Sequence, residues 1–508
     1  MRNSDHTLAG WIFERAALTP DRVAIDFEDR LTTYAELAAA ASRRARALEA
    51  LGCAHGARVA TLARNCPEQV ELFFACAANG LALVPLNWRL APHELAYQMN
   101  DSGASVLFVG EGLRQLADEV TTLFGTPVPV LPLEAGVPSG VVPAEPLVPS
   151  SSGRRPVLDD DPLLVIYTSG TTGRPRGAVL THANCFWTNL SFDRTAPVGS
   201  DDIVLQVLPQ CHVGGWNVQA LLAWWKGARV VLERGFDAGR ALRAMERKRV
   251  TTMMGVPTNY LLLAEHEEFA CADLASLRYL IVGGAPMPKP LLERWLARGV
   301  LFLQGYGLTE AAPNVLCVPP EDALRKAGSA GRPYLHVQVA LRDLSGRDEP
   351  LVQGPGVGEL LVSGPNVFAG YWHDTAATEA AVQDGWLRTG DVAERDADGY
   401  YWIRGRLKEV FISGGENVYP AEVEEVLAGH PGVLEAAVVG VPDDRWGEVG
   451  VAFVVPAANS DVRPEDLRTY LASRLARFKV PRDLRLVEAL PRASEGGKVQ
   501  KWKLREEI

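Results

Sequence analysis

The sequence predicts an α/β fold in which parallel sheets are covered by helices, followed by a smaller α+β domain. In the first half of the chain, helical and strand-like segments alternate, as in the series Tyr34–Leu51, Arg58–Ala63, Glu68–Asn79 and Ala82–Leu86. A second β–α series spans residues 201–304. Because repeated alternation of this kind is typical of βαβ units, we expect the strands of both series to lie in parallel sheets.

The character of the sequence changes after about residue 330, where short strand-like runs are separated by turn residues. The pair Asp398-Gly399 between two such runs indicates a hairpin. Farther on, helices are expected at Pro420–Ala428, which starts with proline, and at Pro464–Phe478, whose apolar residues recur at helical spacing. Between these two helices, Ala436–Val441 is expected to form a strand.

These segments define the predicted domains. Residues 1–404 form a large N-terminal domain of stacked β–α sheets plus a β-barrel-like subdomain, residues 405–408 form a hinge, and residues 409–508 form a small α+β domain. The last segment has the size of a small independent domain. At 508 residues, the whole chain exceeds what a single hydrophobic core usually supports, so more than one domain is expected.

Composition and charge narrow the classes of function. The net charge of −11 argues against a general nucleic-acid-binding protein, which would carry a basic surface, but it allows local cationic pockets. The seven cysteines are scattered without a Cys-x-x-Cys motif, which indicates reduced thiols. We find no signal peptide and no apolar segment long enough to cross a bilayer, so we expect a cytoplasmic protein without a transmembrane segment.

The most informative segment is the run YTSGTTGRPRG, from Tyr167 to Gly177, which directly follows an apolar run. A short apolar run that ends at Gly, Ser and Thr is typical of a buried strand leading into a surface loop. Glycines let backbone N–H groups approach a polyphosphate, hydroxyls donate hydrogen bonds to it, and arginine offsets its charge. Taken alone, such a run is more often an ordinary surface turn.

Four further segments carry residues suited to the same kind of ligand, and each also has an ordinary structural interpretation. In QGYGLTE, Tyr306 offers a flat face for a base and Glu310 offers a carboxylate for Mg²⁺, or the segment is a turn in which Thr309 caps a helix. In RTGD, the Asp391 carboxylate suits ribose hydroxyls, or it belongs to a simple glycine turn. The last two candidates are SGGENVYP, whose ordinary interpretation is a loop, and the C-terminal GGK. The ordinary interpretation of its Lys498 is a solvated lysine.

In this order and at these spacings, the segments resemble the adenylate-forming superfamily of acyl-CoA synthetases, firefly luciferases and adenylation domains. The resemblance covers essentially the whole chain and rests on the motifs YTSGTTGRPRG, LPQCHVGG, GGAP, QGYGLTE, RTGD, GRLKEVFISGGENVYPAEVE and GGK. Members of this superfamily activate a carboxylic acid with ATP as an acyl-adenylate and usually pass the acyl group to a thiol. The resemblance therefore implies a carboxylate–CoA ligase that uses ATP, Mg²⁺ and CoA, and it allows a homodimer.

The resemblance also implies roles in nucleotide binding, position by position. The β- and γ-phosphates would be held by Thr168, Ser169, Gly170, Thr171, Thr172 and Gly173. The adenine would lie on Tyr306, in a pocket lined by Gly284, Ala285, Pro286, Gly305 and Gly307. Thr309 would contact the α-phosphate, Glu310 would bind Mg²⁺, and Asp391 with Arg406 would hold the ribose.

For the C-terminal domain, the resemblance implies mobility, with rotation about Lys408 between the two half-reactions. Lys498 would reach the carboxylate and the α-phosphate during adenylation. Rotation would then withdraw this lysine and bring Gly414, Gly415 and Glu416 to the site, where they would shape a tunnel for the pantetheine of CoA. Two positions depart from the usual pattern. Arg176 stands where lysine is usual, and one extra residue precedes Lys498, which leaves Lys501 and Lys503 as weaker candidates.

The resemblance places the acyl pocket at His212, Trp216, Asn217, Val218, Gly283 and Gly305. His212 aligns with a gate and is a candidate catalytic residue, or it is a packed structural histidine. Tryptophan and valine favour an apolar or aromatic monocarboxylic acid, and the lack of aspartate in Cys211–Ala220 disfavours an amino acid. CoA is favoured as acceptor because no carrier domain is appended. The alternatives are an enzyme that loads a separate acyl carrier protein, a non-catalytic ligand-binding relative and a luciferase-like oxygenase.

Overall fold

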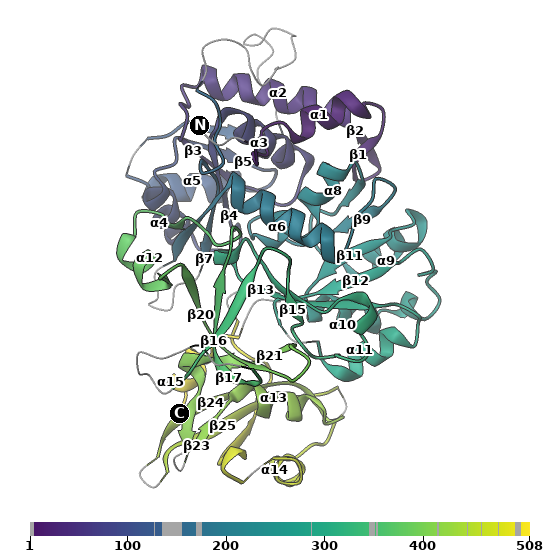
Figure 1. The fold of residues 1–508 in the computed structure, drawn as a ribbon, viewed down its shortest axis with the longest axis vertical. Helices are drawn as coiled ribbons and strands as arrows, with labels where there is room; N and C mark the ends of the chain where they lie inside the picture. The colour runs from purple at the N-terminus through teal and green to yellow at the C-terminus, as the bar shows by residue number, and fades with distance from the viewer. Residues whose placement is uncertain are drawn as a thin grey trace.

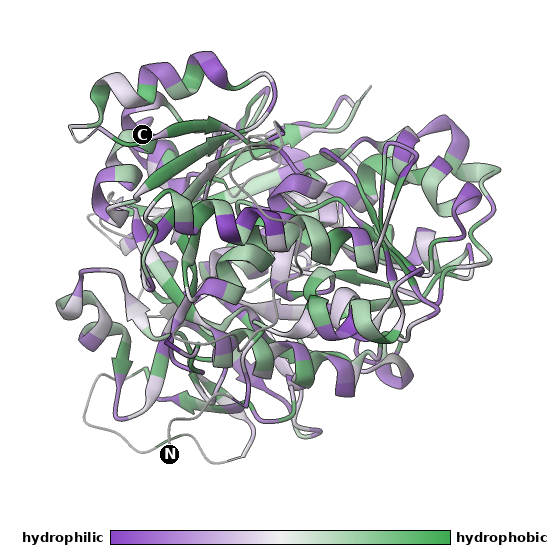
Figure 2. Cartoon of the chain, turned by 90° about the horizontal axis from the view of Figure 1, so that it is seen from above, coloured by the Kyte–Doolittle hydropathy of each residue, from purple (hydrophilic) through white to green (hydrophobic). Residues whose placement is uncertain are grey.

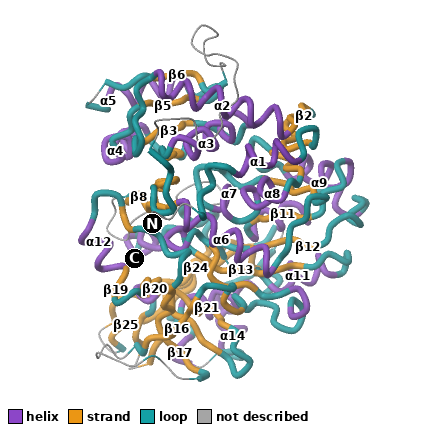
Figure 3. Tube along the Cα trace, turned by 45° about the horizontal axis from the view of Figure 1, so that its top comes forward, coloured by secondary structure: helices purple, strands orange, loops and turns teal. Residues whose placement is uncertain are grey.

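The computed structural model describes residues 5–125, 127–134, 155–168, 175–285, 287–344, 351, 354–413, 416–443, 446–458, 460–475, 477–492 and 499–508, without the side chains at 320, 416 and 417. Of the helices in these ranges, none has the length and apolarity needed to cross a lipid bilayer. Helices α1 to α3 gather at one end of the molecule and the C-terminal strands at the other (Figures 1 and 3).

Two large mixed sheets form the N-terminal part of the molecule. The first has seven strands in the order β18-β8-β7-β4-β3-β5-β6, and the second has nine in the order β15-β14-β13-β12-β11-β9-β10-β1-β2. The strands of the first sheet are β3 (Arg58–Leu62), β4 (Ala82–Leu86), β5 (Val106–Val109), β6 (Val130–Pro132), β7 (Pro162–Thr168), β8 (Arg176–Thr181) and β18 (Gly370–Tyr371). Those of the second are β1 (Val23–Phe27), β2 (Arg30–Thr33), β9 (Ile203–Gln206), β10 (Arg229–Leu232), β11 (Thr252–Gly255), β12 (Tyr279–Val282), β13 (Phe302–Gly307), β14 (Asn314–Cys317) and β15 (Arg332–Pro333).

The interior strands of both sheets run parallel, as the β–α alternation predicts. In the first sheet, β3, β4, β5 and β6 are parallel to their neighbours and β7 is parallel to β4; in the second sheet, the strands from β13 to β1 are parallel. The edge strands β8, β18, β2, β14 and β15 pair antiparallel. Short hairpins join β1 to β2 and β7 to β8, and a connection of that length permits only antiparallel pairing.

Helices α2, α3, α6 and α8 share one hydrophobic core with both sheets, whereas α4 and α5 pack on the other face of the first sheet and α9 to α11 on the other face of the second. The helices carry both hydrophilic and hydrophobic residues (Figure 2). This mixture is expected for helices that pack one face against a sheet. The helices are α1 (Trp11–Leu18), α2 (Tyr34–Ala50), α3 (Pro67–Asn79), α4 (Pro92–Ser102), α5 (Arg114–Leu123), α6 (His182–Thr195), α7 (Gly214–Asn217), α8 (Ala220–Lys226), α9 (Ala238–Arg247), α10 (Pro257–Glu265), α11 (Lys289–Leu296) and α12 (Thr375–Ala381).

The short-strand segment forms a third, antiparallel sheet. Its order is β16-β17-β20-β19, with β21 paired to the other part of β20. The strands are β16 (Gln338–Arg342), β17 (Gly356–Ser363), β19 (Val382–Gln383), β20 (Trp386–Arg395) and β21 (Tyr401–Arg406). The predicted hairpin at Asp398-Gly399 is confirmed, because it connects β20 to β21, and Gly399 has the left-handed φ of 82° that the turn requires.

The C-terminal segment folds as the predicted small α+β unit. Its five-stranded sheet has the order β23-β22-β25-β24 with β26 parallel to β25. The strands are β22 (Phe411–Ser413), β23 (Glu416–Val418), β24 (Val433–Asp443), β25 (Gly447–Pro456) and β26 (Asp483–Leu486), and the helices are α13 (Pro420–Ala428), α14 (Pro464–Ala472) and α15 (Lys501–Glu506).

One predicted helix is too long. The sequence predicts a helix over Pro464–Phe478, but α14 ends at Ala472. After Ala472 the chain forms a turn, in which the hydroxyl of Ser473 donates to the carbonyl of Tyr470 over 2.8 Å, and Arg477–Lys479 forms a separate 3₁₀ turn.

The described hydrophobic cores also divide where the hinge is expected. Three clusters of buried hydrophobic residues contain only residues up to Tyr401, and Ile403 packs against one of them. Two other clusters contain only residues from Phe411 onward. The predicted hinge, residues 405–408, lies in the interval between them. Rotation at this point stays a prediction.

Candidate active site

The run from Tyr167 to Gly177 is the hairpin between β7 and β8. Tyr167 pairs with Gly177 and Thr168 pairs with Arg176, so the hairpin leaves the sheet at its antiparallel edge. A Cβ at Gly177 would lie 2.8 Å from Cγ1 of Val165, which explains the glycine at this position. The predicted phosphate ligands Ser169, Gly170, Thr171, Thr172 and Gly173 lie outside the described residues.

A buried carboxylate lies at the centre of the predicted ribose and adenine site. Asp391 is only 4% exposed, and its Oδ1 lies 2.8 Å from Nε of Arg406. The Tyr306 hydroxyl donates to Oδ2 over 2.5 Å, and the backbone N–H of Asp391 donates to Oγ1 of Thr389 over 3.0 Å. Arg406 also donates from Nη1 to the carbonyl of Thr389 over 3.0 Å. The structure therefore brings together three predicted residues that lie up to a hundred positions apart in the chain.

Electrostatics keep the Tyr306 hydroxyl protonated. Desolvation raises the pKa of Tyr306 well above its usual value, and the neighbouring charge of Asp391 raises it further. The tyrosine therefore stays protonated and donates its hydrogen bond at neutral pH. Because its ring is fixed beside Asp391, a base on the ring and a ribose on the carboxylate would be neighbours.

Glu310 lies in a short 3₁₀ turn, Thr309–Ala311, directly after strand β13. Its Oε1 accepts a 2.8 Å hydrogen bond from the Tyr371 hydroxyl, and its carbonyl accepts one of 2.9 Å from the backbone N–H of Phe368. Desolvation and the charge of Glu310 raise the pKa of Tyr371, so this hydroxyl also stays protonated.

The donor set around Glu310 fits Mg²⁺ only in a particular way. Within the described ranges, no group of three or more His, Cys, Asp or Glu side chains could hold a metal ion. Mg²⁺ is commonly bound by one or two carboxylates plus substrate phosphates and waters. A single half-buried carboxylate therefore suits a Mg²⁺ ion that arrives with a nucleotide.

Glycines lie at the carboxyl ends of the neighbouring strands β12 and β13. The carboxyl ends of β11, β12 and β13 lie side by side, which places Gly283, Gly284 and Ala285 next to Gly305–Gly307. A Cβ at Gly283 would lie 2.9 Å from Cε of Met254 and 3.3 Å from the carbonyl oxygen of Gly305. A Cβ at Gly307 would overlap the Pro313 carbonyl. The strands can approach each other here only because these positions have no side chain. Pro286 lies outside the described residues.

The predicted acyl-pocket residues divide into two groups. His212 is exposed at the surface of the segment before α7, although partial desolvation and the nearby charge of Arg89 lower its pKa, which favours a neutral imidazole. Trp216 is fully buried, stacks on Phe73 at a centroid distance of 4.8 Å and donates from Nε1 to the carbonyl of Gln210. Its side chain is thus engaged in the core.

Asn217 and Val218 continue this buried stretch. Asn217 accepts a hydrogen bond from Asn189 over 3.2 Å and donates to Sγ of Cys185 over 3.2 Å, and it has no exposed surface. Val218 is buried as well. Contact of Trp216, Asn217 and Val218 with an acyl group therefore stays a prediction.

Comparison with known proteins matches this geometry to a family. Residues 12–372 match the family model for AMP-binding enzymes, and residues 422–497 match the model for the AMP-binding enzyme C-terminal domain. The chain belongs to the AMP-binding enzyme family. This result confirms the resemblance to adenylate-forming enzymes and the fold class inferred from the sequence.

Relatives of this AMP-binding enzyme align over nearly their full length. It is 43% identical to a feruloyl-CoA synthase of Amycolatopsis sp., with 99% of each chain covered. It is 40% identical to an indoleacetate–CoA ligase of Aromatoleum aromaticum, with 98% of each covered. The structure of Bacillus subtilis O-succinylbenzoate coenzyme A synthetase in complex with ATP and a magnesium ion aligns with a TM-score of 0.85 at 32% identity, covering 98% of this chain and 99% of that one.

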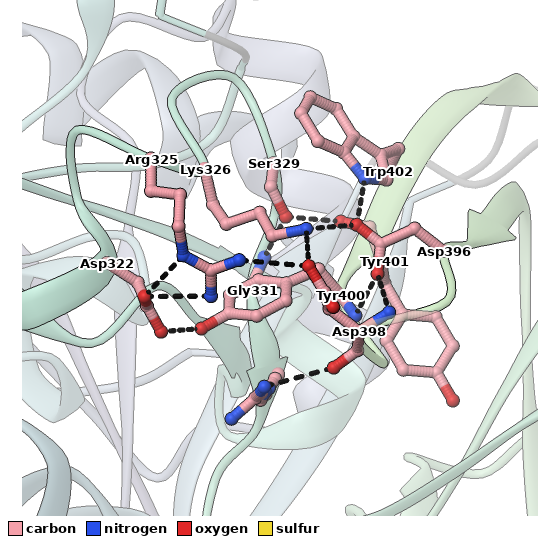
Figure 4. A network of polar contacts seen from close by, with 11 residues as sticks. Asp322, Arg325, Lys326, Ser329, Gly331, Asp396, Asp398, Tyr400, Tyr401 and Trp402 are labelled. Atoms are coloured by element: carbon pink, nitrogen blue, oxygen red, sulfur yellow. Dashed lines mark hydrogen bonds and ion pairs between the residues drawn. The ribbon is translucent and has the colours of Figure 1, made fainter.

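In this AMP-binding enzyme, a polar network anchors the β20–β21 hairpin, which carries Asp391 (Figure 4). At the hairpin tip, Nζ of Lys326 lies 2.8 Å from Asp396 and 2.6 Å from Asp398. Desolvation alone would raise the pKa of Asp396, but the hydrogen bonds from Lys326, Tyr400 and Trp402 lower it to about 2. Asp391 and Arg406 pair directly at the other end of the same ladder, so the network supports their register.

The C-terminal domain of this AMP-binding enzyme holds the remaining predicted residues. Lys408 is exposed in the 3₁₀ turn Leu407–Glu409, where desolvation and the charge of Arg406 lower its pKa. Lys498, Gly414 and Gly415 lie outside the described residues, and only the backbone of Glu416 is described. Lys501, the weaker alternative to Lys498, forms ion pairs with Glu409 at 3.0 Å and Glu424 at 2.8 Å. These contacts engage Lys501 within its own domain and favour Lys498 for the reaction.

Sequence reasoning missed two residues next to the site. Tyr371 contacts Glu310, and Asp374 contacts Arg176. Both lie in a segment whose sequence indicates only short strands and turns. An isolated tyrosine sixty-one residues after Glu310 carries no local signal. A strand-to-strand pairing of β18 with β8 could have suggested it, but single-sequence patterns do not reveal such a pairing.

Proposed function

We propose that this protein is an ATP-dependent carboxylate–CoA ligase. In the first step, an oxygen of the substrate carboxylate attacks the α-phosphorus of ATP, so that an acyl-adenylate forms and pyrophosphate leaves. In the second step, the CoA thiol gives up its proton and attacks the acyl carbon, so that a thioester forms and AMP leaves. The observation that carries this proposal is the cluster of Tyr306, Asp391 and Arg406, with Glu310 on the same strand–turn segment as Tyr306.

The nucleotide end of the site follows from this cluster. Asp391 accepts hydrogen bonds from the ribose hydroxyls while Arg406 keeps its charge balanced, and the Tyr306 ring supports the adenine. Thr309 contacts the α-phosphate. The run from Thr168 to Gly177 binds the β- and γ-phosphates, a role that its glycines and hydroxyls suit.

Glu310 holds the Mg²⁺ that accompanies ATP. The ion supplies charge neutralisation to the phosphates when it is bound. The protein supplies orientation: the carboxylate of the substrate and the α-phosphate are both negative, so positioning and charge compensation dominate the barrier. Lys498 adds a positive charge at these two groups during the first step.

A change of domain orientation separates the two steps. The cores divide on either side of residues 405–408, which supports a pivot at Lys408. Rotation there withdraws Lys498 and brings the loop of Gly414, Gly415 and Glu416 to the site, where CoA enters. The rotation thus lets one site serve two different nucleophiles.

The proposed acyl substrate is an aromatic or apolar monocarboxylic acid. Ferulate and indoleacetate, for which two relatives are named, are aromatic acids, which supports the aromatic class. His212 stands at the entrance in a form that favours the neutral imidazole, which suits contact with an apolar group.

The test is an ATP-dependent assay over aryl, medium-chain and long-chain acids, with and without CoA. The expected result is acid-dependent pyrophosphate release without CoA and thioester formation with it, strongest for aryl acids. Thioester formation only on an added acyl carrier protein would favour the carrier-loading alternative. Absence of pyrophosphate release with every acid would favour the non-catalytic alternative, and light emission would favour the luciferase-like one. A cytoplasmic location and a homodimer belong to the same proposal, and fractionation and sedimentation would test them.

A further inference from the structure

Arg176, which stands where the superfamily usually has lysine, is held in a specific arrangement. Its Nε lies 3.2 Å from Oδ2 of Asp374, and its guanidinium carbon lies 5.6 Å from the centre of the Tyr371 ring. The Tyr371 hydroxyl in turn donates to Oε1 of Glu310 over 2.8 Å. These four side chains form a continuous series of contacts from the end of the phosphate hairpin to the carboxylate assigned to Mg²⁺.

The backbone around Tyr371 leaves its ring little freedom. In β18, Tyr371 lies opposite Ala178 of β8, and its N–H donates to Oγ1 of Thr378 over 2.8 Å. The ring of Phe368 meets the Tyr371 ring edge-on at 4.9 Å, and the N–H of the same Phe368 donates to the carbonyl of Glu310. The hydroxyl and its acceptor are therefore fixed relative to each other from both sides.

We propose that Tyr371 is a positioning residue for the Glu310 carboxylate, and that Arg176, anchored by Asp374, holds the Tyr371 ring in place. With Oε1 accepting from Tyr371, Oε2 would be the oxygen left to hold Mg²⁺. This inference rests on the proposed function, in which Glu310 holds Mg²⁺. Residues that orient a metal ligand through a hydrogen bond contribute to metal affinity without touching the metal.

The arrangement also explains how arginine serves at position 176. A guanidinium is planar, so it can pair with the Asp374 carboxylate at its edge and lie against an aromatic ring at the same time. The compact ammonium of lysine cannot make both contacts in this way. Arg176 therefore acts on the site through Tyr371, from the strand that ends the phosphate hairpin.

The test measures the coupling between Mg²⁺ and ATP binding rather than turnover. ATP affinity is measured calorimetrically on the full-length protein, once in EDTA and once at increasing free Mg²⁺. The ratio of the ATP affinity with Mg²⁺ to the ATP affinity in EDTA gives the coupling. In Tyr371→Phe, which keeps the ring and removes the hydroxyl, the coupling is expected to fall about tenfold. Affinity in EDTA is expected to stay within about twofold, because the nucleotide contacts are intact. The matched control is Tyr470→Phe in α14, which removes a hydroxyl far from the site.

Equal coupling in Tyr371→Phe and Tyr470→Phe would overturn the proposal. The variant Glu310→Gln distinguishes a failure of this proposal from a failure of the proposed function. If Glu310→Gln lowers the coupling and Tyr371→Phe does not, the positioning role is wrong and the metal assignment stands. If Glu310→Gln also leaves the coupling unchanged, the metal assignment itself is wrong.

Asp374→Asn provides a second, milder test should Tyr371→Phe fold poorly. Asp374 caps α12 by accepting from the N–H of Ala377 over 2.9 Å, and asparagine preserves such a cap. The change removes only the charge that anchors Arg176. The coupling is expected to fall about threefold, roughly the loss of one partly exposed ion pair. An unchanged coupling would overturn the role of Arg176.

Discussion

Replacing Asp391 by asparagine tests the nucleotide site most directly. Asparagine has nearly the same shape, but it loses the negative charge and offers an N–H₂ group where the carboxylate has a second oxygen. In the wild type, one oxygen accepts from Arg406 and the other from Tyr306. Whichever way the amide is oriented, its N–H₂ group faces one of these donors, so the change removes an acceptor that the site needs.

The expected loss in ATP affinity follows from the strength of the lost contact. A hydrogen bond to a charged acceptor contributes about 1.5–3 kcal/mol, and Asp391 is buried enough for that range to apply. A loss of about 2 kcal/mol at the ribose corresponds to roughly thirtyfold weaker binding. Because the ribose contacts are the same before and during the reaction, KM for ATP should rise while kcat changes little.

The assay is calorimetric titration with ATP, combined with steady-state kinetics at saturating acid. Asp466→Asn, an exposed aspartate at the start of α14, is the matched control and should bind ATP as the wild type does. Thermal melting of both variants separates a loss of binding from a loss of folding. An Asp391→Asn protein that melts normally and binds ATP within about twofold of the wild type would refute the assignment of this carboxylate to the ribose.

Three further predictions concern the proposed catalytic lysine, the proposed metal ligand and the hairpin network. Lys498→Ala should lower adenylate formation by about a hundredfold or more while sparing thioester formation from presynthesised acyl-adenylate, and an equal loss in both steps would contradict the two-orientation scheme. Glu310→Ala should raise the Mg²⁺ concentration needed for half-maximal pyrophosphate release, and unchanged dependence would exclude the assignment. Lys326→Met should lower the melting temperature at neutral pH. The folded-state pKa of Asp396 is about 2, below its ordinary 3.8. The difference in melting temperature between variant and wild type should therefore be full above pH 4 and shrink towards pH 2. A pH-independent difference would show that the ion pair is not its source.

The regular elements could be predicted because their signals are local. Strand β4 and helix α13 have the predicted bounds, and the apolar run that leads into YTSGTTGRPRG forms β7. Their patterns of apolar residues and their proline starts depend only on neighbouring residues. Helix α14 ends at Ala472, before the predicted Phe478, although the apolar periodicity continues to Phe478.

The site residues could be named from the sequence only through motifs. Tyr306 and Asp391 lie in distinctive short runs, so each could be assigned a role before its partners were known. Trp216 and Asn217 lie in such a run as well, but the folded chain engages both side chains in the core. A motif gives a position along the chain, whereas the direction of a side chain depends on what packs around it.

The sequence by itself thus determined the α/β architecture and the family, and it predicted a phosphate-binding role for the hairpin between β7 and β8. Only the tertiary structure decided what surrounds the ends of that hairpin and its neighbouring carboxylates. Arg176 is the first residue of β8, but its partners Tyr371 and Asp374 lie nearly two hundred residues farther along the chain. Such contacts arise when an edge strand pairs with a distant segment, and the free energy of that pairing depends on the whole sheet rather than on any local pattern.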